Sequence, residues 1–210
     1  MDNLYEYKNS AELNSLKSSV ENQLVRGNGE AYGVELFFNK KSGNITGWFG
    51  YTLSWTRRQF DDLNNGKVFY PKYDRRHDLS LVVAYRINDQ FSTGITWTYA
   101  SGERYSMSPG QYRFNEISPG TGTNIYVDYP ELNNAQLPAF HKMDLNLTYK
   151  FTLFNMPFEA YINIYNLYNR QNPFARYVST ESDGNGNTIT KVKQLVLFPI
   201  IPTFGFNFKF

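Results

Sequence analysis

Hydrophobic and polar positions alternate along the last nine residues of the chain, 202–210. Every second position is phenylalanine, and the positions between them are Thr, Gly, Asn and Lys. The four phenylalanines are Phe204, Phe206, Phe208 and Phe210. Because successive side chains of a β-strand point to opposite faces, this segment has one aromatic face and one polar face. Such a strand is typical of an outer-membrane barrel, with apolar side chains toward lipid and polar ones toward the lumen.

The same two-residue period recurs along the chain and predicts an antiparallel sheet of about seven strands. The predicted strands are 30–40, 44–57, 75–87, 91–100, 142–151, 158–168 and 202–210. The parity of the sixth strand slips at Asn166-Leu167, which predicts a bulge. Residues 175–182 and 189–198 predict a protruding hairpin. Residues 1–29 are expected to form an extracellular loop and the lead-in to the first strand, and whether they add a strand is left open.

The connections between the predicted strands fall into two length classes. Turns at 41–43, 88–90 and about 153–157 are short, whereas the connections at 61–74, 102–139 and 169–200 are long. Outer-membrane barrels have short periplasmic turns and long extracellular loops. The pattern therefore predicts an all-β fold, an antiparallel transmembrane β-barrel segment over 30–210. It also predicts a location in the bacterial outer membrane, with the C-terminus in the periplasm.

Composition agrees with strands rather than helices as the membrane segments. Aromatic residues make up 18% of the 210 residues, yet the mean hydropathy is −0.53. No run approaches the roughly 20 apolar residues that a spanning helix needs. The absence of cysteine excludes disulfide chemistry, and a net charge of +2 gives no reason to expect a nucleic-acid partner.

An odd number of strands predicts that the sheet continues beyond this chain. Seven strands leave two unpaired edges, whose polar groups lipid cannot satisfy. The first residues, 1–7, also lack the basic and apolar regions of a signal peptide. We therefore expect residues 30–210 to be the C-terminal part of a larger barrel.

Five segments resemble the late barrel strands of TonB-dependent outer-membrane receptors. They are YGVEL at 32–36, TGWFGYTLSW at 46–55, YDRRHD at 73–78, NLYNRQNPF at 166–174 and FPIIP at 198–202. The nearest likeness is to members that carry an N-terminal carboxypeptidase-like regulatory domain. The terminal phenylalanines, Phe204 to Phe210, also resemble the signal by which the barrel assembly machinery recognises its clients.

The resemblance implies a 22-stranded barrel occluded by an N-terminal plug, which imports a scarce ligand with energy delivered through TonB. It implies four partners: outer-membrane lipid and lipopolysaccharide, the rest of the barrel with its plug, the TonB system and the assembly machinery. The chain contains no plug and no TonB box, so we expect no transport by this polypeptide alone. Two alternatives stay open. One is a self-contained eight-stranded barrel acting as a porin or adhesin, and the other is a hydrolase at the outer rim.

The hydrolase alternative depends on the two histidines, His77 and His141. Each lies near an aspartate, and Ser80 or Ser101 could serve as the nucleophile. Parity instead turns both imidazoles toward the lipid headgroups, so no catalytic residue is assigned and no enzyme activity is expected. The segment 183–188 resembles a calcium loop, but it lacks the glycine and glutamate of an EF-hand at the required positions, and a hairpin turn is the preferred interpretation. No cofactor and no metal site are expected.

Arginine pairs near the predicted outer rim are the candidate ligand contacts. Arg57, Arg58, Arg75 and Arg76 could bind lipopolysaccharide phosphates or an anionic ligand, and solvated loop positions are an equal alternative. The Trp and Tyr residues are expected to form interfacial girdles rather than a ligand cage. Loops 102–139 and 169–200 are the candidate specificity loops, because specificity in such barrels lies on exposed loops.

Overall fold

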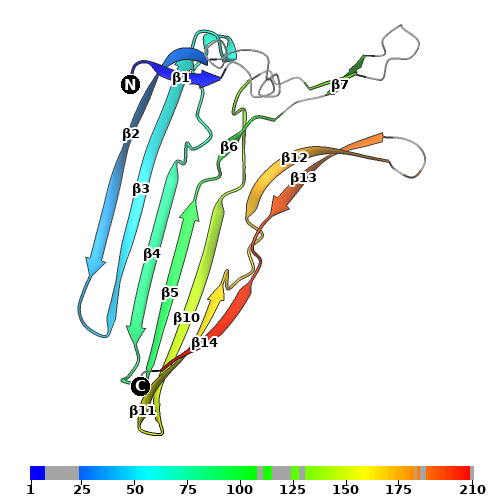
Figure 1. The fold of residues 1–210 in the computed structure, drawn as a ribbon. Coiled ribbons are helices and arrows are strands. Elements are labelled where there is room, and N and C mark those ends of the chain that lie inside the picture. Colours follow the sequence, from blue (N-terminus) through cyan, green and yellow to red (C-terminus); the bar gives the residue numbers. More distant parts are fainter. Residues whose placement is uncertain are drawn as a thin grey trace. The chain divides into compact units, whose positions relative to one another are not determined.

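The computed structural model describes residues 1–7, 24–107, 111–114, 124–127, 131–182, 184 and 188–208. These residues form an all-β protein whose main element is one antiparallel sheet of eight strands (Figure 1). They contain no α-helix, only the short 3-10 turn η3 at Asn64–Gly66. No helix in the described part of the chain is long and apolar enough to cross a membrane.

The main sheet has the strand order β1-β2-β3-β4-β5-β10-β11-β14, so most neighbours in the sheet are also neighbours along the chain. Its strands are β1 Leu4–Tyr7, β2 Leu24–Lys40, β3 Ile45–Phe60, β4 His77–Arg86, β5 Phe91–Ala100, β10 Phe140–Leu153, β11 Met156–Tyr165 and β14 Ile201–Phe208. Most of these strands show the period-two alternation, which turns the majority of their apolar side chains to one face.

The strand count predicted from the sequence, about seven, is wrong by one for the main sheet. Residues 4–7 form β1, which pairs antiparallel with the start of β2, from Leu4 opposite Gly27 to Tyr7 opposite Leu24. The β2 strand begins at Leu24 rather than at Glu30. Alternation is poor in this part of the chain, and the extension of β2 lies between β1 and the end of β3, so pairing with neighbouring strands rather than the local pattern accompanies it.

Among the described residues, three smaller antiparallel pairs lie outside the main sheet. They are β6 Arg104–Tyr105 with β9 Ala135–Gln136, β7 Gln111–Phe114 with β8 Asn124–Val127, and β12 Pro173–Ser182 with β13 Thr188–Val196. The third pair is the hairpin predicted from residues 175–182 and 189–198. The bulge predicted at Asn166-Leu167 is absent, because β11 ends at Tyr165 and Asn166 turns the chain with φ 52°.

The chain divides into two compact units. Unit 1 comprises Met1–Tyr32, Trp55–Asp74 and Glu103–Gln136, and unit 2 comprises Gly33–Ser54, Arg75–Gly102 and Leu137–Phe210. Unit 1 has a small hydrophobic core of Val25, Phe60, Leu63 and Phe69, against which Leu4 and Leu132 pack. The predicted loop 61–74 is therefore partly a packed element of unit 1.

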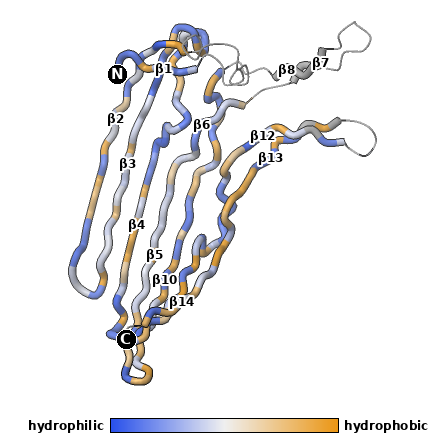
Figure 2. Tube along the Cα trace, viewed as in Figure 1, coloured by the Kyte–Doolittle hydropathy of each residue, from blue (hydrophilic) through white to orange (hydrophobic). Residues whose placement is uncertain are grey.

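Unit 2 is built differently, as a single layer of strands without a comparable core. Among its described residues only Ala100 and Leu137 are buried hydrophobic side chains. Large apolar side chains stay exposed instead, for example Phe38 at 63%, Ile162 at 47% and Phe204 at 82%. Figure 2 shows hydrophobic and hydrophilic residues interspersed along these strands. The sheet therefore has an apolar face that the described residues do not cover.

Candidate functional site

One end of the apolar face of unit 2 carries a row of stacked rings, which we call the first aromatic band. The band consists of Phe91, Tyr149, Phe151, Phe158 and Phe208, from β5, β10, β11 and β14. Successive ring centroids lie 4.4, 5.5, 5.5 and 5.8 Å apart. Cross-strand register aligns these residues, since Phe91 opposes Tyr149, Phe151 opposes Phe158 and Phe158 opposes Phe208.

The other end of the same face carries the second aromatic band, which includes both histidines. The band consists of Tyr51, His77, Trp97, Tyr99, His141 and Tyr168. The Tyr51 hydroxyl lies 2.8 Å from His77 Nδ1, and the Tyr168 hydroxyl lies 2.8 Å from His141 Nδ1. Trp97 Nε1 donates to the Tyr168 hydroxyl at 3.3 Å. The polar groups of Tyr51, His77, Trp97, His141 and Tyr168 are therefore paired with one another, while the ring bodies stay on the apolar face.

The opposite face of unit 2 is polar, and its side chains interact across the strands. Asn146 Nδ2 donates to Asn163 Oδ1 at 2.5 Å, and Thr148 Oγ1 donates to Asn146 Oδ1 at 3.1 Å. Lys142 forms an ion pair with Asp144. Polar groups of β10 and β11 thus satisfy one another on this face.

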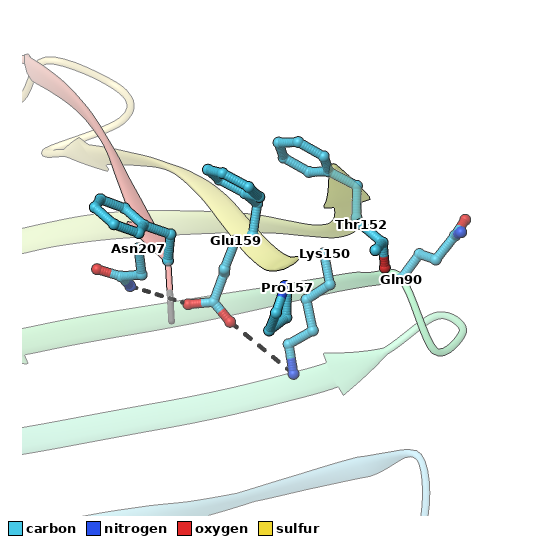
Figure 3. A pocket seen from close by; sticks show the side chains of 9 residues that line it. Gln90, Lys150, Thr152, Pro157, Glu159 and Asn207 are labelled. Atoms are coloured by element: carbon cyan, nitrogen blue, oxygen red, sulfur yellow. Dashed lines mark hydrogen bonds and ion pairs between the residues drawn. The ribbon is translucent and has the colours of Figure 1, made fainter. Parts of the chain in front are cut away.

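A groove of about 750 Å³ lies on unit 2 beside the first aromatic band. Lys150 Nζ lies 4.0 Å from a carboxylate oxygen of Glu159, and Asn207 Nδ2 donates to the same carboxylate at 3.2 Å. Figure 3 shows this polar row crossing β10, β11 and β14, with Gln90 and Thr152 at its margin. The charges of the groove are therefore compensated within the sheet.

Two aromatic rings, those of Phe37 and Trp48, lie on the polar face of unit 2. Trp48 opposes Val82 in the register, in the same parity as Thr46 opposite Ala84 and Gly50 opposite Ser80. The ring centroids of Phe37 and Trp48 lie 6.1 Å apart, and both rings flank the position where a Cβ of Gly50 would stand. The assignment of all Trp and Tyr residues to interfacial girdles did not anticipate the pairing of Trp48 with Phe37. The signal was available, since Trp48 shares parity with Thr46 and Thr52.

A corner after β11 is built by asparagine side chains that hydrogen-bond to the backbone. Asn166 is fully buried, accepts from the Arg170 amide at 2.9 Å and donates to the carbonyl groups of Arg170 and Phe198. Asn172 donates to the His141 carbonyl and accepts from its amide. Much of the segment NLYNRQNPF therefore has a structural role, and it positions the start of the β12–β13 hairpin.

The four candidate arginines lie in different surroundings. Arg57 and Arg58 are in unit 1, where Arg57 pairs with Glu30 at 3.5 Å and Arg58 pairs with Glu6 at 2.8 Å. Arg75 and Arg76 are in unit 2, and their carbonyl groups accept from Ser54 Oγ and the Ser54 amide. Their role as ligand contacts stays a prediction.

The residues considered for hydrolysis do not form a triad within the described part of the chain. Ser101 Oγ accepts from the His77 backbone amide at 3.0 Å, while the His77 ring is bonded to Tyr51. Ser80 lies on the polar face, opposite Gly50 and Thr98. Among the described residues no three His, Cys, Asp or Glu side chains are grouped so that they could hold a metal ion.

Two predictions fall in part outside the described residues. Of the calcium-like segment 183–188, Gly184 is described, with φ 81°, and so is the backbone of Thr188. Of the four terminal phenylalanines, Phe210 lies outside the described residues, and Phe204, Phe206 and Phe208 are exposed. No known protein family, curated protein or solved structure matches the chain.

Proposed function

We propose that unit 2 is a segment of an outer-membrane β-barrel wall, with its apolar face toward lipid. The observation that carries the proposal is a single-layer sheet whose apolar face is exposed. A water-soluble domain buries such a face against a second layer of helices or strands. Outer-membrane barrels bury it in the bilayer instead, which needs no second layer of protein.

The spacing of the two aromatic bands supports the same orientation. Phe91 and Tyr99 are eight residues apart on β5, and His141 and Tyr149 are eight residues apart on β10. Eight residues of strand span about 27 Å, or about 19–22 Å of membrane height at the usual barrel tilt. Girdled apolar bands of outer-membrane barrels are roughly 25 Å tall. In this proposal the polar face of β5, β10 and β11 lines the lumen.

The two free edges of unit 2 support a larger barrel. Within the described residues no strand pairs with the outer side of β2 over 33–40, or with the outer side of β14. Because neighbouring strands alternate in direction, β2 and β14 run the same way (Figure 1). An antiparallel closure between them therefore requires an odd number of additional strands. Closed bacterial barrels of this class have even strand numbers, so seven strands plus an odd number satisfies the rule.

We further propose that this barrel belongs to a TonB-dependent receptor that imports a scarce ligand. The support is the likeness of the segments at 32–36, 46–55, 73–78, 166–174 and 198–202 to late barrel strands of that family. In this interpretation the chain supplies part of the barrel wall and its outer loops, whereas the plug and the TonB contact come from elsewhere in the receptor. The arginines Arg57, Arg58, Arg75 and Arg76 remain candidate contacts for an anionic ligand or lipopolysaccharide.

The eight-stranded main sheet favours one second candidate, a self-contained small barrel. With β1 the strand count becomes even, as closure requires. However, β1 has four residues, whereas a tilted membrane strand needs about 9–11. The size of the native product in the outer-membrane fraction decides between the candidates. A band far above 24.5 kDa favours the receptor, and a heat-modifiable band near 24.5 kDa favours the small barrel.

The test of membrane embedding uses the absence of native cysteine. Single cysteines are placed at 145–149 of β10, spin-labelled, and exposed to oxygen and to a water-soluble nickel chelate in liposomes. We expect oxygen accessibility at Leu145, Leu147 and Tyr149, and nickel accessibility at Asn146 and Thr148. Equal nickel accessibility at all five positions would overturn the proposal.

A further inference from the structure

The polar face of unit 2 contains an aromatic pair, Phe37 and Trp48, that the lipid-facing role of the sheet does not explain. Trp48 is 38% exposed and Phe37 is 66% exposed. Both rings lie on the face of Gly50, opposite to the face of Phe49 and Tyr51. If the apolar face meets lipid, these two rings meet water or whatever occupies the lumen.

Gly50 leaves the space between the two rings open. A Cβ at this position would stand 3.6 Å from Trp48 Cζ3 and 3.9 Å from Phe37 Cδ2. The rings are tilted by 33° and lie 6.1 Å apart, so together they form a shallow aromatic platform. Two exposed aromatic rings present apolar faces, and such faces can pack against the apolar C–H face of a six-membered sugar ring.

The neighbours of the platform are uncharged on the side of β3, β4 and β5. Thr46 and Gly50 flank Trp48 along β3, Val82 opposes it, and Ser80 and Ala84 are diagonal to it. Thr96 follows Val82 in the next strand, about 10 Å from Trp48 at the usual strand spacing. Hydroxyl groups both donate and accept hydrogen bonds, which suits a ligand that carries many hydroxyls of its own.

The side of β2 adds acceptors and donors beside Phe37. Glu35 and Asn39 precede and follow Phe37 by two residues, so they share its face of the strand. Elsewhere on the polar face, Lys142 pairs with Asp144 and Lys150 with Glu159. Arg86 shares this face of β4, four residues along from Val82, while the positions directly around the platform are mainly hydroxyl-bearing or apolar, which favours a neutral ligand over an anionic one.

We propose that Phe37 and Trp48 bind a pyranose ring of a neutral oligosaccharide on the lumen side of the sheet. This inference rests on the proposed function, because it requires the polar face to line an aqueous lumen. Trp48 supplies the main stacking surface, Phe37 extends it, and the hydroxyl groups of Thr46, Ser80 and Thr96 with the Glu35 carboxylate receive the sugar hydroxyls.

The test measures binding by calorimetry. The ligands are three neutral hexasaccharides, of the maltose, cellulose and xylan types, and one anionic hexasaccharide, hexagalacturonate. The sample is the native protein, extracted from the outer membrane in detergent. We expect at least one neutral hexasaccharide to bind and Trp48→Ala to weaken it on the order of tenfold. The matched control is Trp55→Ala, the same residue type on the same strand with the opposite parity, which should leave the affinity unchanged.

Three outcomes overturn the inference. They are no binding of any neutral hexasaccharide, binding of hexagalacturonate alone, and equal losses in Trp48→Ala and Trp55→Ala. Shielding of Trp48 from acrylamide without any sugar present would indicate a protein segment on the platform and would also count against it. The spin-label pattern on β10 separates the failures: if it alternates and no sugar binds, only this inference fails.

Discussion

Units 1 and 2 use apolar residues in opposite ways. In the small core of unit 1, Phe60 is 1% exposed and Leu63 is 4% exposed. In unit 2, Phe204 and Phe206 are 82% and 65% exposed. Unit 1 also pairs segments that are distant in sequence, since the Asn64 side chain accepts from the Leu132 amide and donates to its carbonyl. A core is what a segment surrounded by water requires, and an uncovered apolar face is what lipid can satisfy. Described residues of two long connections, 61–74 and 103–136, therefore belong to one packed unit, whereas the third connection, 169–200, belongs to unit 2.

The largest expected effect is on the core of unit 1. Phe60→Ala removes a ring that is 1% exposed and lies 6.0 Å from the ring of Phe69. Cavity formation should cost about 3–5 kcal/mol. Hydrogen exchange at residues 58–69 should accelerate, while exchange in β10 stays unchanged. Phe174→Ala, at a ring that is 62% exposed, is the control and should change stability by less than about 0.5 kcal/mol. Equal effects of the two substitutions would remove the distinction between core and surface.

The second prediction compares the cost of a positive charge on the apolar face of unit 2 with its cost on the polar face. Leu147→Arg places a cation on the apolar face opposite Ile162, at an expected cost of about 2–4 kcal/mol in a bilayer. Thr203→Arg places the same cation on the polar face, where water solvates it, at less than about 0.5 kcal/mol. Denaturant unfolding from liposomes measures both. If the two substitutions destabilise equally, the assignment of faces is wrong.

The asparagine corner of unit 2 should be more sensitive than its position in a connection suggests. Asn166→Ala leaves the Arg170 amide and the Phe198 carbonyl without this partner and places alanine at φ 52°. We expect a loss of about 1–3 kcal/mol, seen as faster exchange of the Arg170 amide. Asn169→Ala places alanine at a similar φ, 51°, but removes a single bond, from the Ile200 amide, and should cost less. A smaller effect at Asn166 than at Asn169 would contradict this account.

The smallest effect is a pH dependence of the β12–β13 hairpin. Hydrogen bonds from Lys193 and then Lys191 hold the pKa of Glu181 below its ordinary value of 4.5. Because the folded-state pKa is lowered, the stabilisation is present above pH 4.5 and is lost as the pH falls through the folded-state value. Exchange in the hairpin should therefore increase in that acidic range. Glu181→Gln should remove the pH dependence of exchange in the hairpin. If the pH dependence is unchanged in Glu181→Gln, another titrating group causes it.

The strands of unit 2 were the part of the fold that the sequence predicted well. The period-two alternation at Phe91–Ala100 coincides with β5, and the predicted strand 142–151 lies within β10. A strand with one apolar and one polar face can be predicted from its local sequence pattern. Residues 24–29 carry no such alternation, and they form a strand between two neighbours, with Leu4–Tyr7 paired to 24–27 on one side and the end of β3 on the other.

The candidate site was predictable only in part. The second aromatic band contains His77 and His141, on the apolar side that parity indicated. Phe37 and Trp48 were not recognised as a pair, because they are eleven residues apart in sequence and meet only when β2 lies beside β3. The role of Asn166 was equally hidden, since its partners Arg170 and Phe198 are positioned by the turn itself.

The sequence by itself determined the strand class, the positions of the short turns and the face of most side chains, because these follow from a local period. Only the tertiary structure decided that residues 1–7 join the sheet, that Phe60, Leu63 and Phe69 form a core, and that Phe37 meets Trp48 across two strands. Each of these depends on pairing or packing between separate strands and turns, such as Val25 with Phe60 or Phe37 with Trp48, which the period of hydrophobic and polar residues does not encode.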